Sequence, residues 1–259
     1  MSSKFTKFVL VINEPTSSFN NKTNNTKTIS IMSDQQVFEA SPESKAKARN
    51  LRIIAMIAWI VAMAGQVFAI LKLISDETMV WLIVTIVGIL ALAITGSMLW
   101  KKANRLDPAS EKDSTRFFIQ NQLGAIMGVL AFLPLAIFIF MNKDISGKTK
   151  GIAGSVAVVA MLAAGITGVD FDPPSVEKYT KEINEQTDAL KELNVGDNVY
   201  WTSAGNRYHI YEDCHHIKNK SNKSNGSVKE SWDQKGISEL CKTCNNRAHK
   251  QKPVLEMAN

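Results

Sequence analysis

Acidic and basic residues are almost absent from four long stretches of this 259-residue chain. The stretches are 53–74, 79–100, 117–141 and 151–169, and Lys72 is the one charged residue within them. Each approaches or exceeds the roughly 20 residues that cross a bilayer core of about 30 Å. One such run could be a buried helix of a soluble protein, but four in succession with polar links favour a membrane protein with four spanning helices.

Ionisable side chains are also missing from the middle of these stretches. Such residues usually mark an ion or proton pathway, so their absence disfavours a transporter, while a passive channel-like bundle stays an alternative. The sequence shows no Ser/His/Asp set and no glycine loop of the kind that cradles phosphate. We therefore expect the protein not to be an enzyme.

Lys and Arg are unevenly distributed between the ends of the apolar stretches. Four lie in 45–52, just before the first stretch, none lies in 75–78, five lie in 101–116 and three lie in 142–150. Because positive residues concentrate on the cytoplasmic side, the first three counts favour a multi-pass protein of the cell membrane with both termini in the cytoplasm. The three residues of the third link run against this pattern.

Small residues recur every four positions in the last two stretches. Gly124 and Gly128 form one such face, and Ala160, Ala164 and Gly168 form another. Small residues let helices approach closely in lipid, so these faces predict tight packing and offer a route to a homo-oligomer. A proline at position 134 predicts a kink in the third span.

Cysteine is scarce as well, with three residues that all lie within 214–244. Together with a preceding histidine they form the pattern His-x4-Cys-x26-Cys-x2-Cys. Two close pairs of such ligands, separated by a loop, are typical of a tetrahedral zinc site. The sequence therefore predicts that Zn²⁺ is bound by His209, Cys214, Cys241 and Cys244. A cytoplasmic location agrees with this, since thiols stay reduced there.

Three other histidines compete for the fourth ligand position. His215 and His216 directly follow the first cysteine, and adjacent residues chelate one ion poorly. His249 would have to reach back from a helix, so spacing favours His209. The competing interpretation is that the three cysteines are ordinary thiols.

The remaining segments predict a chain of four parts: a disordered, polar N-terminal segment 1–50, a four-helix transmembrane domain 51–170, an amphipathic linker helix 171–195 and a zinc-binding domain 196–259. Met32 is a plausible natural start, and we assign no function to residues 1–31. Val176, Ile183 and Leu190 recur every seven residues in the linker. This stripe favours a helix that docks on the zinc-binding domain over a self-associating seam.

Within 196–259, two β-rich runs at 199–202 and 207–210 flank a glycine-containing turn and predict a hairpin. The Lys/Asn/Ser-rich stretch 218–226 predicts a mobile loop. Ser227 is a helix cap for 228–235, with Gly236 as the stop, and 245–251 predicts a last helix. The expected fold is an α-helical four-span transmembrane bundle with a small α+β zinc-binding domain at the C-terminus.

This C-terminal region resembles the metal-binding domain of the Ada DNA-repair protein and its relatives. The resemblance rests on Tyr208-His209, the Cys214 turn, the helix that ends in Gly236 and the Cys241-Lys242-Thr243-Cys244 run, and covers under a fifth of the chain. It implies a zinc-holding fold. In Ada four cysteines hold the zinc, and one accepts a methyl group from DNA phosphotriesters. That cysteine corresponds to His209, whose imidazole is no such acceptor, so the resemblance implies zinc binding without repair chemistry.

Basic residues outnumber acidic ones in 199–259 by ten to six, a net charge of +4. Such charge suits anionic lipid headgroups and nucleic acid alike. The favoured function is a non-enzymatic membrane protein whose zinc module binds a cytoplasmic partner, either protein or nucleic acid. One alternative is a reactive or sensing zinc thiolate, with Cys214 as the most exposed candidate. The other is a small channel-like bundle that the module regulates.

Overall fold

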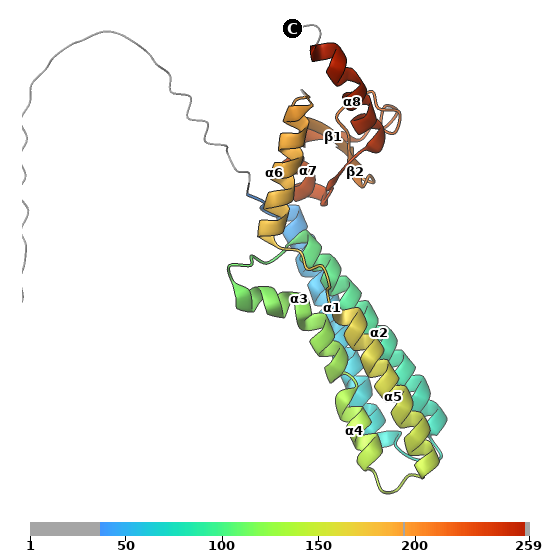
Figure 1. Cartoon of the computed structure of the whole chain (residues 1–259). Helices are drawn as coiled ribbons and strands as arrows, with labels where there is room; N and C mark the ends of the chain where they lie inside the picture. The colour runs from blue at the N-terminus through green and yellow to red at the C-terminus, as the bar shows by residue number, and fades with distance from the viewer. Residues whose placement is uncertain (1–36, 194, 257–259) are drawn as a thin grey trace, which may run out of the picture. The chain divides into compact units, whose positions relative to one another are not determined.

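The computed structural model describes residues 37–256 except residue 194, and these belong to one compact unit that spans 35–259. Four helical stretches are long and apolar enough to cross a membrane: α1 (Pro42–Lys72), α2 (Met79–Leu106), α3 (Ser114–Leu130) together with α4 (Leu133–Met141), and α5 (Gly147–Gly168). The four apolar stretches predicted to span a membrane are therefore helical. Figure 1 shows α1, α2 and α5 running alongside one another. Residues 1–31 and Met32, the predicted natural start, lie outside the described residues.

Helix α1 begins well before its apolar run. Ser41 caps it by accepting a hydrogen bond from the Ser44 N–H, and Pro42 occupies the first turn, where its missing N–H costs nothing. Residues 42–50, which were expected to belong to the polar N-terminal segment, are thus helical. Polarity does not reveal that the helix begins at Pro42, because a charged first turn can still be helical.

The third span is interrupted where the sequence predicted a kink. Helix α3 ends at Leu130 and α4 begins at Leu133, with Pro134 in its first turn. Proline lacks the N–H that would bond to the carbonyl of residue 130, and its ring crowds that carbonyl. The predicted kink is confirmed as a break between two helices.

Helix α1 turns a face of small side chains into the bundle, and many large apolar side chains of the bundle are exposed. Along α1, Ala48, Ala55, Ala62 and Ala69 recur every seven residues and are completely buried. Helices α2 and α4 add large buried side chains, including Leu82, Ile86 and Leu135. Other large side chains face outward, as with Ile60, which is 66% exposed. A soluble domain rarely exposes so much contiguous apolar surface, so this surface indicates contact with lipid.

The two predicted small-residue faces pack against each other within the chain. A Cβ on Gly128 would lie 2.8 Å from the Ala164 backbone, and a Cβ on Gly168 would lie 2.4 Å from the backbone of Gly124. The contact between α3 and α5 therefore depends on glycine at these positions. A homo-oligomer stays a prediction, and these faces are already occupied within one chain.

Helix α6 (Val176–Glu192) connects the bundle to the C-terminal region. Its first residues are held by the link between α2 and α3: the Val176 N–H donates to the Ala109 carbonyl, and the Ser110 hydroxyl donates to Glu177 at 2.5 Å. Further along, Ile183 and Leu190 are buried in the core of the C-terminal region. The linker therefore docks on that region, in agreement with the favoured interpretation.

The C-terminal region is a small α+β module, and two of its expected elements need correction. Strand β1 (Asn198–Thr202) pairs antiparallel with β3 (Lys223–Ser227), so part of the expected mobile loop 218–226 is a strand. Strand β2 (Arg207–Tyr208) pairs parallel with β4 (Glu239–Leu240). The predicted hairpin survives as a single bridge, in which Tyr200 and His209 exchange two hydrogen bonds of 2.7 Å.

The helices of the module follow their sequence signals. Helix α7 (Val228–Lys235) has the predicted Ser227 cap, which forms a reciprocal capping box with Glu230. It stops at Gly236, whose φ of 65° is a left-handed conformation that suits glycine. Helix α8 (Lys242–Glu256) is longer at both ends than the predicted 245–251.

We predict that Gly168→Ala destabilises the bundle by about 1–3 kcal/mol, the range typical of an overpacked core. The added methyl group would press on the backbone of α3, which cannot move as a side chain can. Gly151→Ala on the same helix is the control, because a Cβ there meets nothing within 4 Å. Thermal unfolding of the purified chain in detergent would separate the two; equal unfolding temperatures would contradict the packing argument.

Candidate metal centre

His209 directly follows strand β2 and points into the module. Its backbone is fixed by the two hydrogen bonds to Tyr200, and its side chain is 6% exposed. Because side chains alternate along a strand, the buried Tyr208 faces the core on the opposite side. The register of this short strand therefore decides which way the imidazole points.

Cys214 lies in a tight turn that immediately follows. Its N–H donates to the Tyr211 carbonyl, and its own carbonyl accepts from the N–H groups of Ile217 and Lys218, both at 2.8 Å. Arg247 on α8 pairs with Asp213 at 2.8 Å and lies 4.1 Å from the Tyr211 ring centre. These contacts hold the Cys214 turn against the helix that carries another of the cysteines.

Cys241 and Cys244 flank the first turn of α8. The Cys241 N–H donates to the Tyr208 carbonyl at 2.8 Å, which joins this segment to the strand that precedes His209. Since Cys244 lies three residues further on, the helical turn brings both thiols to one side. Hydrogen bonds of the backbone thus assemble all three segments.

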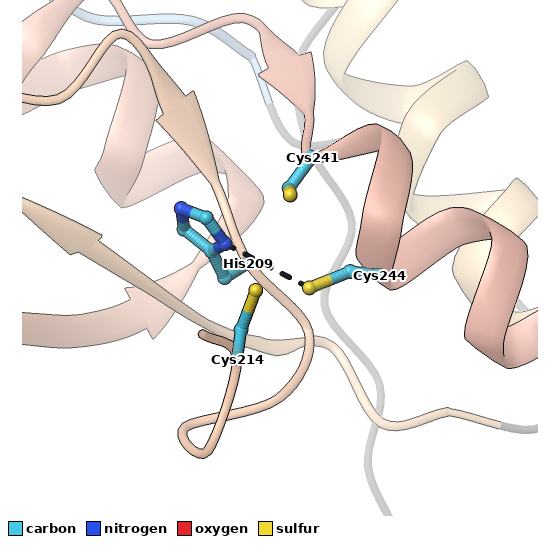
Figure 2. Close-up of side chains that lie close together, drawn as sticks. All are labelled: His209, Cys214, Cys241 and Cys244. Atoms are coloured by element: carbon cyan, nitrogen blue, oxygen red, sulfur yellow. Dashed lines mark hydrogen bonds between the residues drawn. The ribbon is translucent and has the colours of Figure 1, made fainter. Parts of the chain in front are cut away.

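The donor atoms of His209, Cys214, Cys241 and Cys244 all lie within 4.8 Å of one another, and all four residues are buried. Figure 2 shows the three sulfur atoms and the imidazole converging on one point. His209 Nδ1 lies 3.7 Å from Cys244 Sγ. A tetrahedral ion with its usual bond lengths separates nitrogen and sulfur ligands by roughly 3.6 Å, so the cluster could hold a metal ion with little adjustment.

The protonation states of these groups are set by burial and by helix α8. Burial lowers the pKa of His209, with smaller contributions from the neighbouring His216 and His215, which favours the neutral imidazole that binds metal. Burial raises the pKa of Cys244 to about 12. Burial also opposes ionisation of Cys241, but hydrogen bonds, chiefly from the N–H groups of Cys244 and Thr243, bring its pKa below the usual value. The first turn of α8 therefore favours a thiolate at Cys241.

The competing histidines lie outside this cluster. His215 and His216 are exposed, with their ring centres 3.8 Å apart, and the His216 ring centre is 6.2 Å from that of His209. His249 is exposed on α8. The structure thus brings together the four residues that spacing selected, and the identity of the metal stays a prediction.

A cavity of about 430 Å³ beside the cluster was not predicted from the sequence. His209 and Cys241 line it, together with the cationic side chains of Arg207 and Lys242 and the ring of His216. Among the residues that the structure describes, none of those lining this cavity is acidic. The sequence indicates positive charge near the cluster only through Lys242, which lies inside the Cys-x-x-Cys run. The other residues that line the cavity come from segments far apart in the sequence, so the sequence does not predict their meeting.

The chain matches no family model, no curated protein and no solved structure. The resemblance to the Ada metal-binding domain therefore stays a prediction that rests on the residues named above. Function must be argued from the four apolar helices, the His/Cys₃ cluster and the surfaces around it.

We predict one bound metal ion per chain, measured by elemental analysis of the full chain purified in detergent under reducing conditions. His209→Ala and Cys244→Ser should each lower occupancy, because each removes a donor that three others cannot replace. His249→Ala is the matched control and should retain the metal. Full occupancy in His209→Ala, with loss in His249→Ala, would show that the wrong histidine has been chosen.

Proposed function

We propose that the protein is a non-enzymatic, multi-pass membrane protein whose C-terminal module holds a structural zinc ion and binds an anionic partner at the cytoplasmic face. The observation that carries this proposal is the buried, four-donor His/Cys₃ cluster with a cationic cavity beside it. Three thiolates and one imidazole form a donor set that zinc commonly occupies in structural sites. Zinc would supply a fixed crosslink between the Cys214 turn, β2 and α8.

A structural role is supported by the size of the module and by the number of donors. A domain this small buries little apolar surface, so metal binding can provide much of its folding free energy. Four protein donors complete a tetrahedron and leave no open position for a substrate water. The likeness to Ada agrees with zinc binding, while His209 at the position of the methyl acceptor argues against repair chemistry.

Nucleic acid is the partner that the cavity favours. Arg207 and Lys242 supply positive charge, and the polar side chain of Asn206 lines the same space. Arg207 is paired with Glu239, whereas Lys242 is exposed and has no ion pair among the described residues. An unpaired lysine beside an acid-free cavity suits a phosphate group of the backbone.

The cytoplasmic placement is supported by the positive residues at the ends of the spans. Segment 101–116, which contains the link between α2 and α3 and the adjoining helix ends, carries five Lys and Arg, and α6 is hydrogen-bonded to that same link. The module would then be on the side where positive residues concentrate. This side also keeps the thiols reduced.

The test measures binding of labelled DNA and RNA oligonucleotides to the full chain in nanodiscs by fluorescence anisotropy at several salt concentrations. We expect affinity to fall as salt rises, and Lys242→Gln to reduce the salt slope by about one, because one lysine–phosphate pair is removed. Lys112→Gln, a lysine of the α2–α3 link outside the cavity, is the control. Salt-independent retention, or none, would rule out nucleic acid and direct the search to a protein partner.

A second candidate function is a reactive thiolate. The cavity favours Cys241 for this role, in place of the predicted Cys214. Cys214 is the most exposed of the three cysteines, but at 5% it is buried, and only Cys241 lines the cavity. In this reaction the Cys241 sulfur attacks an alkyl carbon, a thioether forms and the leaving group departs with its electron pair. The hydrogen bonds from the first turn of α8 favour the thiolate that this attack needs.

We predict for this candidate that iodoacetamide modifies Cys241 first in the metal-loaded chain, with iodide as the leaving group and the metal retained. Peptide mass spectrometry with parallel metal analysis would show the site and the occupancy. Modification of Cys214 first, or modification only after the metal is lost, would remove this candidate.

A further inference from the structure

A second cavity, of about 380 Å³, lies between the bundle, α6 and α7, away from the metal cluster. Lys102 and Arg105 line it from the last turns of α2, Lys178, Tyr179 and Glu182 from α6, and Trp232 from α7. Its volume is within the range of roughly 300–1,000 Å³ that small-molecule sites occupy. The metal centre and its cavity share none of these residues.

Most charges around this cavity are already paired, but two are not. Arg105 pairs with Asp170 at 3.2 Å, and Lys178 pairs with Asp172 at 2.5 Å. Lys102 and Glu182 have no ion-pair partner among the described residues. The walls therefore present one unpaired cation and one unpaired carboxylate to the same space. Burial raises the pKa of Glu182 because it disfavours the charged carboxylate. A cationic ligand group beside the carboxylate would offset this effect.

An aromatic pair forms one wall of the cavity. The rings of Tyr179 and Trp232 meet edge to face, with 4.8 Å between their centres. Trp232 is 4% exposed, and its Nε1 is fully buried, so the pair presents apolar ring surface to the cavity and not a hydrogen-bond donor.

The position of the cavity indicates which ligand is available. The apolar run of α2 ends at Trp100, so Lys102 and Arg105 lie just beyond it, where headgroups are found. Phe171, next to the lining residue Asp172, is 79% exposed and can anchor in the same layer. A lipid whose headgroup enters the cavity would keep its acyl chains beside the exposed apolar surface of the bundle.

From these observations we propose that the cavity binds the headgroup of a phospholipid that carries both a phosphate and a primary ammonium, the phosphatidylethanolamine class. Lys102 binds the phosphate, Glu182 accepts hydrogen bonds from the ammonium, and the aromatic wall closes the site. The headgroup would then connect the end of α2 to α6 and α7. This inference does not depend on the metal or on the proposed nucleic-acid partner.

The test counts the lipids that the full chain retains after detergent extraction, using native mass spectrometry with phosphatidylethanolamine, phosphatidylcholine and phosphatidylglycerol. We expect retention of phosphatidylethanolamine over phosphatidylcholine by about tenfold, since a choline group has no N–H to donate to Glu182. Lys102→Gln should reduce retention of phosphatidylethanolamine. Glu182→Gln should abolish the preference over phosphatidylcholine while the thermal unfolding temperature stays that of the parent chain, which separates a change in selectivity from misfolding.

Control variants and a competition with the soluble headgroup test the lipid assignment further. Lys148→Gln and Glu77→Gln, near the opposite ends of the spans, are charge-matched controls and should leave the selectivity unchanged. Soluble glycerophosphoethanolamine should not displace the lipid at equal concentration, because it lacks the acyl chains. Displacement by it would overturn the lipid assignment, and equal retention of all three lipids would overturn the site.

Discussion

Four donor atoms from three segments must meet at one point in the C-terminal module, and the arrangement of that module follows from this requirement. The parallel pairing of β2 and β4 places the segment before His209 beside the segment before Cys241. The hydrogen bond from the Cys241 N–H to the Tyr208 carbonyl fixes their register. The Arg247–Asp213 pair adds the Cys214 turn. Each of these contacts alone contributes little to the free energy of folding. A metal ion bound to all three segments would make their folding cooperative.

Small residues set the closest helix contacts of the bundle, whereas the module depends on large side chains. The alanines of α1 and the glycines between α3 and α5 let helix backbones approach closely, and large side chains such as Leu82 and Phe132 are buried beside them. The core of the module contains Trp201 and Tyr208, as in a soluble domain. Helix α6 belongs to both, since polar contacts fix its beginning while Ile183 and Leu190 enter the module core.

Features that depend on local chemistry could be predicted from the sequence, and features that depend on distant partners could not. The four nearly charge-free runs, the Ser227 cap and the Gly236 stop can each be recognised from a contiguous segment of the sequence. Strand β3 does not: Lys223, Ser224, Asn225 and Gly226 have no apolar alternation, and they form a strand because their backbone pairs with β1. The clustering of His209, Cys214, Cys241 and Cys244 was predictable because the spacing typical of metal ligands can be recognised in the sequence. The two cavities were not, since each collects side chains from several elements.

Helix α6 also has a mechanical consequence. Its beginning is fastened to the link between α2 and α3, and Gln186 further along accepts a hydrogen bond from the Tyr208 hydroxyl at 3.0 Å and donates to the Ser238 carbonyl at 2.6 Å. Tyr208 precedes His209, and Ser238 precedes β4. A change in the tilt of α2 or α3, such as bilayer thickness or tension imposes, would therefore be transmitted through α6 to the two strands that directly precede His209 and Cys241.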